Sequence, residues 1–371
     1  MTPDVVFVIQ SLAGGGAEFV TRVWATELTQ RGWQVAVLLT MPAAVEPDLA
    51  GVQVMRMSGS GKHTAIVQIR RLLSSHPDAA FVGMMTGTNL SVLAASLGSR
   101  RTGPVLISER DILHGESQQT RLHLFGRRLA IRALYKRADA LVAISHPVAA
   151  MFLGLARVPT SRILVVPNPA TAKHARATGP QTTVGTADRA SRCLRIAVPA
   201  RIVEKKRPGL ALAVADSVSA SGWQVSLEFF GDGPLRPDVE SWERPYPIRI
   251  HGWKEHWYED VDPTTVVLLP STVEGFGNVL LEAAMRNVPS VAASTALGCA
   301  DAIVPGATGQ LALTDSRDDL AAAVIAAREM TIDVPACWLS RFSATASVDL
   351  LERSLATARL THRHPHSSAA F

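Results

Sequence analysis

Cysteine is scarce in this chain of 371 residues, which has only Cys193, Cys299 and Cys337. Three widely separated thiols are too few for a disulfide framework and lack the paired spacing of a zinc site, so we expect free thiols. Aromatic residues make up only 5% of the sequence, and none of the common nucleic-acid-binding motifs occurs in it. We therefore expect no nucleic-acid partner.

Long apolar runs are also missing from the sequence. No stretch reaches the about 20 uninterrupted apolar residues that a membrane-spanning helix needs. The start, Met1-Thr-Pro-Asp4, has no basic region before the first apolar segment, so it does not have the pattern of a signal peptide. We therefore expect a cytoplasmic protein. A hydrophobic content of 47% with 19% charged residues supports large packed cores, and the length predicts two or more domains.

Short strand-like runs alternate with amphipathic helical patterns, and the alternation occurs twice. The first series of runs is 5–9, 35–39, 80–84, 105–107, 140–144 and 163–166, and the second is 194–198, 225–230, 248–250, 266–269 and 290–293. This alternation predicts parallel sheets with helices on both faces, which is an α/β fold of two Rossmann-like domains facing a cleft. Residues 171–191, rich in Ala, Thr and Gly without apolar periodicity, are the predicted linker. The predicted domains are thus 1–170 and 192–345, followed by a helix and tail over 346–371, whose helix is expected to return to the first domain.

The most informative segment runs from Ser271 to Met285, with the sequence STVEGFGNVLLEAAM. Two carboxylates, Glu274 and Glu282, stand eight residues apart around a glycine-rich turn and the start of an apolar helix. Free amides at such a helix start can receive an anion or sugar hydroxyls. Glu282 has apolar neighbours on its helix and should therefore accept hydrogen bonds from a ligand or a neighbour. The alternative is that Glu274 only caps the helix and that Glu282 is half exposed.

Several other short motifs occur in a definite order along the chain. They are Val5 to Gln10 with Gly14-Gly-Gly-Ala-Glu18, Ala138 to Ser145, Ile163 to Pro169 ending in Pro-Asn-Pro, Arg201-Ile-Val-Glu-Lys-Lys206, Gly231-Asp-Gly-Pro234, His251-Gly-Trp253 and Gly306-Ala-Thr-Gly309. Their order and spacing, together with the paired glutamates, resemble the retaining glycosyltransferases of family 4, which have the GT-B architecture and an E-x7-E motif. The resemblance covers most of the chain.

The resemblance implies a role for each matching residue on the donor side. Arg201 and Lys206 would neutralise the diphosphate of a nucleotide sugar, so that no metal or other cofactor is expected. Glu274 would bind hydroxyls of the transferred sugar, Gly275, Phe276, Gly277 and Asn278 would present amides to sugar and phosphate, and Glu282 would bind the ribose. Gly15 and Gly16 would border the cleft near the donor. The chain departs from the family pattern at Ala200 and at Asp301, where Gly and Glu are usual.

The segment Ser108-Glu-Arg-Asp-Ile-Leu-His114 follows a predicted strand and resembles an acceptor-side segment of bacterial members, with Asp111 in place of Asn. Glu109, Arg110, Asp111 and His114 are therefore the candidate acceptor-binding residues. His114 could orient or deprotonate the acceptor hydroxyl as a catalytic group. The alternative for a lone histidine is a structural role.

Basic residues are concentrated in the first half of the chain. Residues 1–170 hold 17 Lys and Arg against 10 Asp and Glu. At helical spacing Arg121, Arg128, Arg132 and Lys136 fall on one side, with leucines and Phe125 nearby. This pattern is typical of a helix that rests on an anionic membrane surface or meets a lipid pyrophosphate. A solvated helix face is the alternative.

These observations predict a retaining glycosyltransferase that moves a sugar from a nucleotide diphosphate sugar to an acceptor hydroxyl, on a lipid-linked or other saccharide precursor of a bacterial polysaccharide or glycolipid. It would work in the cytoplasm or peripherally at the inner face of the cytoplasmic membrane. Two alternatives share the architecture. One is a nucleotide-sugar 2-epimerase, and the other is a non-catalytic subunit that binds a partner transferase.

Overall fold

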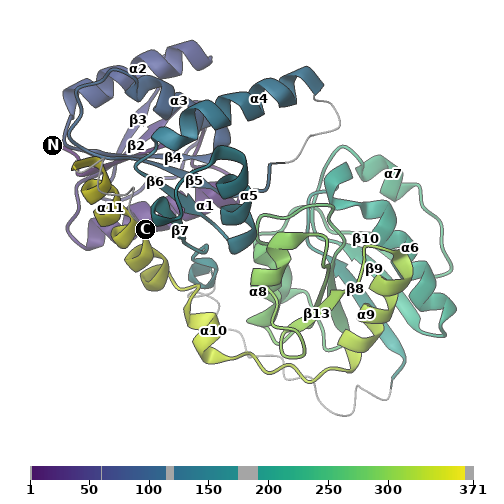
Figure 1. The fold of residues 1–371 in the computed structure, drawn as a ribbon. Coiled ribbons are helices and arrows are strands. Elements are labelled where there is room, and N and C mark those ends of the chain that lie inside the picture. Colours follow the sequence, from purple (N-terminus) through teal and green to yellow (C-terminus); the bar gives the residue numbers. More distant parts are fainter. Residues whose placement is uncertain (1, 60, 114–120, 174–190, 364–371) are drawn as a thin grey trace. The chain divides into compact units, whose positions relative to one another are not determined.

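The computed structural model describes residues 2–59, 61–113, 121–173 and 191–363. These residues form two compact units (Figure 1). The first contains the described parts of Met1–Ala172 and Arg341–Phe371, and the second contains those of Lys173–Ser340. The chain therefore passes from one unit to the other after Ala172 and again after Ser340.

The first unit is built on a seven-stranded parallel sheet in the order β3-β2-β1-β4-β5-β6-β7. Its strands are β1 (Val5–Ile9), β2 (Val35–Leu39), β3 (Gln53–Arg56), β4 (Ala80–Met84), β5 (Val105–Glu109), β6 (Ala140–Ala143) and β7 (Ile163–Val165). Its helices are α1 (Gly16–Gln30), α2 (Lys62–Ser75), α3 (Met85–Ser96), α4 (Arg121–Leu134), α5 (His146–Ala156) and α11 (Ala344–Arg363). The central strands are buried along their whole length, because helices cover both faces of a parallel sheet.

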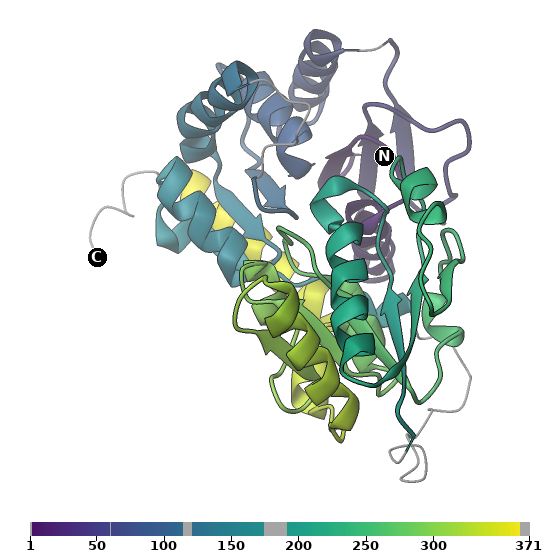
Figure 2. The same cartoon turned by 90° about the vertical axis from the view of Figure 1, so that its right-hand side faces the viewer.

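The second unit has a six-stranded parallel sheet in the order β10-β9-β8-β11-β12-β13. Its strands are β8 (Cys193–Val198), β9 (Gln224–Phe229), β10 (Ile248–Ile250), β11 (Thr265–Leu269), β12 (Ser290–Ala293) and β13 (Gly309–Ala312). Its helices are α6 (Pro208–Ala220), α7 (Arg236–Glu240), α8 (Asn278–Ala284), α9 (Arg317–Glu329) and α10 (Ala336–Ser340). Helices α6 and α9 lie side by side, and residues of both pack in one apolar core with the sheet (Figure 2). The predicted α/β class with two parallel sheets is confirmed.

The last helix, α11, completes the core of the first unit, although its residues lie far along the chain. Val348, Leu351 and Leu355 are buried in the same cluster as the side chains of α1 and β1. Trp24 Nε1 donates to Ser347 Oγ at 2.9 Å, and Arg31 pairs with Asp349 at 2.7 Å. Burial of this apolar face fixes α11 to the sheet.

Candidate functional site

Three loops meet at the carboxyl edge of the second sheet. Residues 199–207 follow β8, residues 270–277 follow β11 and residues 294–301 lie after β12. The strand order reverses between β8 and β11, and the point of reversal is where open parallel sheets usually bind ligands. The predicted donor-site residues Arg201, Lys206 and Glu274 belong to the two loops that flank this point.

An ion pair joins these two loops. Lys206 Nζ donates to Glu274 Oε1, and the two side chains are only 17% and 11% exposed. The backbones are also linked, because Thr272 N donates to Lys205 O at 2.9 Å. The structure thus brings together two predicted site residues that are distant in sequence. It places a cation and a carboxylate side by side at the ligand-binding edge.

The loop after β12 packs directly on the backbone of Glu274. Gly298 N donates to Glu274 O at 3.2 Å. A Cβ at position 298 would lie 2.2 Å from that oxygen and 2.4 Å from Gly275 C, so only glycine fits there. The next residue, Cys299, is buried, and burial together with the nearby Glu274 charge raises the pKa of its thiol. Asp301, at which the chain departs from the family pattern, ends the 3-10 helix of this loop (Leu297–Asp301) and is partly exposed.

Glu282, the second glutamate of the motif, lies inside the unit on α8. Gly277 precedes the helix with a φ of +91° and makes the turn into it. Glu282 is 2% exposed, and each of its oxygens has a partner. Lys173 Nζ donates to Oε1 at 2.8 Å and Trp257 Nε1 donates to Oε2 at 2.7 Å. The half-exposed position considered for Glu282 is therefore wrong, and the expected need for hydrogen-bond donors is met by Lys173 and Trp257.

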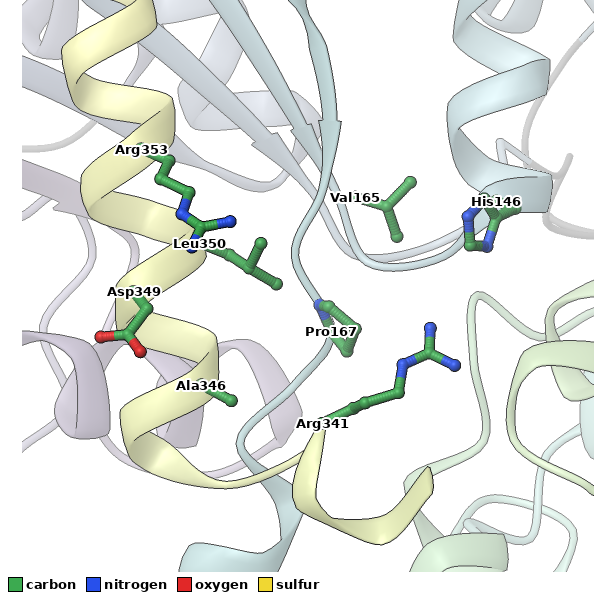
Figure 3. Close-up of a pocket in the computed structure, with 8 residues that line it drawn as sticks. All are labelled: His146, Val165, Pro167, Arg341, Ala346, Asp349, Leu350 and Arg353. Atoms are coloured by element: carbon green, nitrogen blue, oxygen red, sulfur yellow. The ribbon is translucent and has the colours of Figure 1, made fainter. Parts of the chain in front are cut away.

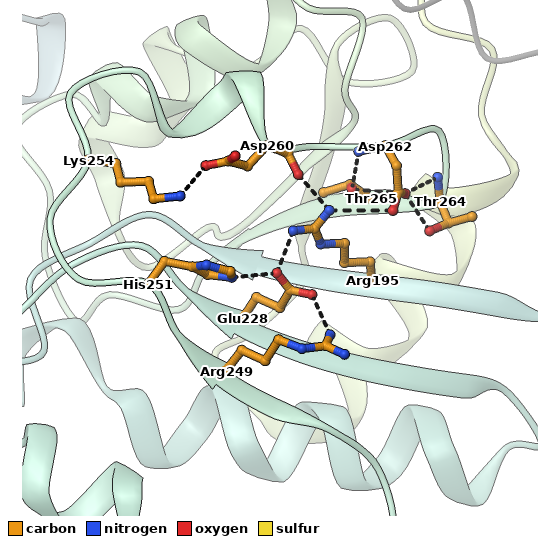
Figure 4. Close-up of polar contacts among 9 residues, drawn as sticks. All are labelled: Arg195, Glu228, Arg249, His251, Lys254, Asp260, Asp262, Thr264 and Thr265. Atoms are coloured by element: carbon orange, nitrogen blue, oxygen red, sulfur yellow. Dashed lines mark hydrogen bonds and ion pairs between the residues drawn. The ribbon is translucent and has the colours of Figure 1, made fainter.

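Trp257 was not predicted as a site residue, and it lies in a loop whose first residue belongs to a polar cluster. The loop that carries it begins at His251, whose Nε2 lies 2.7 Å from Glu228 Oε2. Figure 4 shows Arg195, Arg249 and His251 directed toward the Glu228 carboxylate, which is 4% exposed. Burial would raise the pKa of Glu228, but its bonds to Arg195 and His251 lower it overall. The cluster therefore holds a charged carboxylate that anchors the start of this loop.

The remaining donor-side residues differ in exposure. Arg201 is exposed, and its guanidinium has no hydrogen bond or ion pair with another residue in the described ranges. Gly275 and Phe276 are buried, whereas Gly277 and Asn278 are partly exposed. Arg201 is therefore available for a ligand without breaking an existing pair, unlike Lys206.

In the first unit, the predicted residues Gly15 and Gly16 lie where β1 passes into α1. Gly15 is the N-cap of α1, with no side-chain cap. The loop before Gly15 is bound by Glu46, which lies in the segment after β2. The Glu46 carboxylate accepts from Leu12 N at 2.7 Å and from Ser11 Oγ at 2.8 Å. Burial would raise the pKa of Glu46, but the hydrogen bonds from Ala43, Ser11 and Leu12 lower it overall. This carboxylate fixes the conformation of the loop.

Glu109, a predicted acceptor residue, ends β5 inside a polar cluster. It accepts from Asn89 Nδ2 at 2.9 Å, from Thr86 Oγ1 at 3.1 Å and from the hydroxyl of Tyr135. Burial raises the pKa of Glu109 to about 7, and the three donors offset only part of this effect. The carboxyl group therefore titrates near neutral pH instead of near its ordinary value of 4.5.

The raised pKa of Glu109 predicts a pH-dependent stability. The folded chain binds this proton more tightly than the unfolded chain, so the contribution is complete below the unfolded value of 4.5 and is lost as pH rises through about 7. From about pH 5 to pH 8, the free energy of unfolding of the wild type should fall relative to that of Glu109→Gln by up to about 3 kcal/mol. Urea titrations at several pH values measure the difference. Asp48→Asn, at an exposed position of the same unit, is the control, and equal pH profiles for Glu109→Gln and wild type would contradict the prediction.

The other acceptor candidates have different environments. Arg110 is buried, with Nη1 donating to Val166 O and Asn168 Oδ1 at 3.0 Å and its guanidinium 4.3 Å from the ring of Trp24. Burial lowers its pKa to about 9. These contacts use Arg110 to join β5 to the segment after β7. Asp111 is partly exposed, and His114 lies outside the described residues.

The predicted basic helix is α4, and its outer face is more apolar than expected. Arg128 and Arg132 are exposed, as is Lys136 in the 3-10 helix Tyr135–Arg137 that follows; the side chain of Arg121 lies outside the described residues. Three large apolar side chains share the outer face, with Leu122 80%, Phe125 66% and Leu129 58% exposed. From the sequence, these three residues could be described only as apolar residues near the arginines. In the structure they form an exposed apolar stripe beside the arginines.

A pocket of about 430 Å³ lies beside α11 at the carboxyl ends of β6 and β7. His146, Arg341 and Arg353 line it, and Figure 3 shows Arg341 extending toward His146 with Pro167 beside them. Asp349 also lines it but is paired with Arg31. This pocket could not be predicted from the sequence, because its basic residues come from separate segments without a motif.

In the ranges that the structure describes, no group of three or more His, Cys, Asp and Glu side chains could hold a metal ion. No helix there is long and apolar enough to span a membrane.

Two family models match the chain. Residues 194–329 match the model described as glycosyl transferases group 1, and residues 15–169 match the glycosyl transferase 4-like domain. A curated relative is the lipopolysaccharide 1,6-galactosyltransferase of Escherichia coli K12, with 32% identity over 104 residues. That alignment covers 26% of this chain and only 29% of the relative's length.

Solved structures show the same fold over nearly the whole chain. The lipopolysaccharide outer core galactosyltransferase WaaB in its apo form has a TM-score of 0.71 at 16% identity, covering 95% of this chain and 99% of its own. Anabaena Alr3699/HepE, in complex with UDP and glucose, has a TM-score of 0.66 at 17% identity, covering 99% and 100%. At these identities the likeness concerns the fold alone. With both halves matched by family models and the fold shared along its length, the chain belongs to the group 1 glycosyltransferases of GT-B fold.

Proposed function

We propose that this chain is a retaining hexosyltransferase that uses a nucleotide diphosphate sugar. The observation that carries the proposal is the Lys206–Glu274 pair at the point where the strand order of the second sheet reverses. A departing diphosphate needs positive charge, and a transferred sugar needs hydrogen-bond acceptors for its hydroxyls. The pair supplies both at one place, and family membership gives the reaction class.

Each site residue has a role in this reaction. The bond between the anomeric carbon and the phosphate oxygen breaks, and a bond from that carbon to the acceptor oxygen forms on the same face of the sugar. The acceptor proton goes to the leaving phosphate. Arg201 and Lys206 stabilise the charge that develops on the diphosphate, Glu274 holds the sugar, and Glu282 binds the ribose. Because these cations lie beside the leaving group, the reaction as proposed needs no metal.

We place the acceptor among saccharide or lipid-linked precursors of bacterial lipopolysaccharide or polysaccharide. The curated relative and one of the similar structures are named as lipopolysaccharide galactosyltransferases, whereas no relative reported above supports an epimerase. In the first unit, Asp111 and His114 are the proposed acceptor residues. Glu109 and Arg110 are weaker candidates, because the carboxyl group of Glu109 and the guanidinium of Arg110 are engaged inside the unit.

A donor screen tests the proposed function. Thermal shift and sugar hydrolysis would be measured with UDP-, GDP-, ADP- and dTDP-sugars, and the anomeric configuration of the first product would be read by NMR. We expect one nucleotide to stabilise the protein clearly and the product to keep the donor's configuration. An inverted product would reject the retaining mechanism, and no response to any nucleotide sugar would favour the non-catalytic alternative.

The outer face of α4 supports a peripheral position at an anionic membrane. Leu122, Phe125 and Leu129 expose apolar surface of the kind that enters the headgroup region, and Arg128 and Arg132 beside them can meet lipid phosphates. Each basic residue near such a surface contributes about 1 kcal/mol. An enzyme with a lipid-linked acceptor would gain from this position, because the acceptor is concentrated there.

Liposome flotation tests the membrane contact. The wild type should float with phosphatidylglycerol vesicles at low salt and less so at high salt, because salt screens the charges. Changing Arg121, Arg128, Arg132 and Lys136 to Gln should abolish flotation, as should changing Leu122, Phe125 and Leu129 to Ser. Donor hydrolysis should persist in both variants, and phosphatidylcholine vesicles serve as the uncharged control. If the wild type does not float even at low salt, a soluble acceptor replaces the lipid-linked one.

A further inference from the structure

The carboxylate of Glu282 is nearly closed to solvent, and its two partners differ in their own exposure. Trp257 is 3% exposed and holds Oε2 from the interior. The side chain of Lys173 is 24% exposed, against 3% for that of Glu282. Lys173 therefore lies on the solvent side of the carboxylate. Of these two partners of Glu282, Lys173 is thus the one with exposed side-chain surface.

The interior partner is fixed in place. The ring of Trp257 lies 5.9 Å from that of Phe230 and 6.0 Å from that of Tyr258. Phe230 in turn stacks on His251 at 4.5 Å, and His251 is bound to the buried Glu228 (Figure 4). Moving Trp257 would disturb this whole set of contacts. Lys173, by contrast, has a long stem with several rotatable bonds, so its ammonium can change position without a movement of the backbone.

Lys173 also occupies a particular place in the chain. It ends the 3-10 helix Ala170–Lys173 and is the first residue of the second unit. Two residues earlier, Thr171 donates from both N and Oγ1 to Phe342 O at 3.1 Å within the first unit. The pair with Glu282 thus fastens the first residue beyond the boundary to the candidate nucleotide site.

We propose that Lys173 is a built-in competitor of the nucleotide ribose. In the nucleotide-free protein its ammonium occupies Glu282, and the two ribose hydroxyls of a bound nucleotide displace it by donating to the same carboxylate. This rests on the proposed ribose-binding role of Glu282. Because the ammonium and the ribose use one carboxylate, nucleotide binding weakens the Lys173–Glu282 pair, and the pair weakens nucleotide binding to the same extent.

Isothermal titration calorimetry with the wild type and four variants tests the competition. UDP, GDP and ADP are screened first, and the tightest binder is carried through with its 2′-deoxy form. If Lys173 occupies Glu282 in about nine molecules of ten, Lys173→Met should tighten nucleotide binding about tenfold. Glu282→Gln should weaken it, and adding Lys173→Met to Glu282→Gln should bring no gain, because the shared carboxylate is gone. Lys62→Met, which removes the same charge from an exposed position of the first unit, is the control and should bind like the wild type.

The outcomes separate the inference from the proposed function. If Glu282→Gln weakens binding and Lys173→Met weakens it as well, Lys173 positions the carboxylate and the competition is overturned, while the ribose role stands. If Glu282→Gln and the 2′-deoxy nucleotide both leave affinity unchanged, the ribose role itself falls. Thermal melting of every variant checks that a weaker affinity does not come from unfolding.

Discussion

Replacing Arg201 and Lys206 together by Ala is expected to lower kcat/KM by on the order of 10³-fold, and to lower turnover far more than it lowers stability. Their charges matter most as the diphosphate departs, so the loss should appear mainly in kcat. The two single variants should differ in their effect on the neighbouring residues. Arg201→Ala removes an exposed side chain without a partner in the described ranges, whereas Lys206→Ala also leaves the carboxylate of Glu274 without its cation.

Arg207→Ala is the matched control for this experiment. Arg207 belongs to the same loop but pairs with Asp315 at 2.7 Å, so its loss should leave kcat close to that of the wild type. EDTA should have little effect on the wild type. If chelation abolished activity and Mg²⁺ restored it, a metal would carry the role that we give to Arg201 and Lys206.

The second large effect is expected from a single methyl group. Gly298→Ala places a Cβ where it would meet Glu274 O at 2.2 Å and Gly275 C at 2.4 Å. Both are backbone atoms, so no side-chain rotation relieves the clash, and the segment 274–275 must move. We expect a loss of stability of about 3 kcal/mol and a fall in kcat of about 10²-fold from the displaced Glu274. Urea denaturation and steady-state kinetics measure the two effects.

Gly209→Ala is the control for the glycine substitution. Gly209 lies in α6, and a Cβ there would meet nothing within 4 Å, so Ala should be neutral or should stabilise the helix by up to about 1 kcal/mol. Wild-type kinetics in Gly298→Ala would show that the loop after β12 moves freely and does not position Glu274.

The central strands could be predicted from the sequence because they are continuous apolar runs buried on both faces. Two of the four edge strands, β3 and β13, were missed. β3, with the sequence QVMR, is partly exposed along its length, and β13, with the sequence GQLA, begins with a glycine that packs on the backbone of Ser290. Neither has the apolar run that marks a buried strand. The order of the motifs along the chain identified the fold family in spite of these gaps.

The candidate site could be predicted only in part, because motifs name residues but not their partners. Lys206 and Glu274 were both predicted, but their pairing depends on two loops that meet only through the strand order. Lys173 and Trp257 reach Glu282 from 109 and 25 residues away, and neither belongs to a recognisable pattern. The internal role of Arg110 likewise depends on Val166 and Asn168, which adjoin it only in the folded sheet.

The packing of α11 on the first unit has a consequence for synthesis. The second unit is one continuous segment, whereas the first needs residues from both ends of the chain. Because domains fold as they leave the ribosome, the unit translated second can complete its core before the unit translated first. Until α11 emerges, the surface that Val348, Leu351 and Leu355 cover in the folded chain stays open to water. The nascent chain therefore carries an unfinished first unit while the whole second unit is translated, and a chaperone that shields this surface would act on it during that interval.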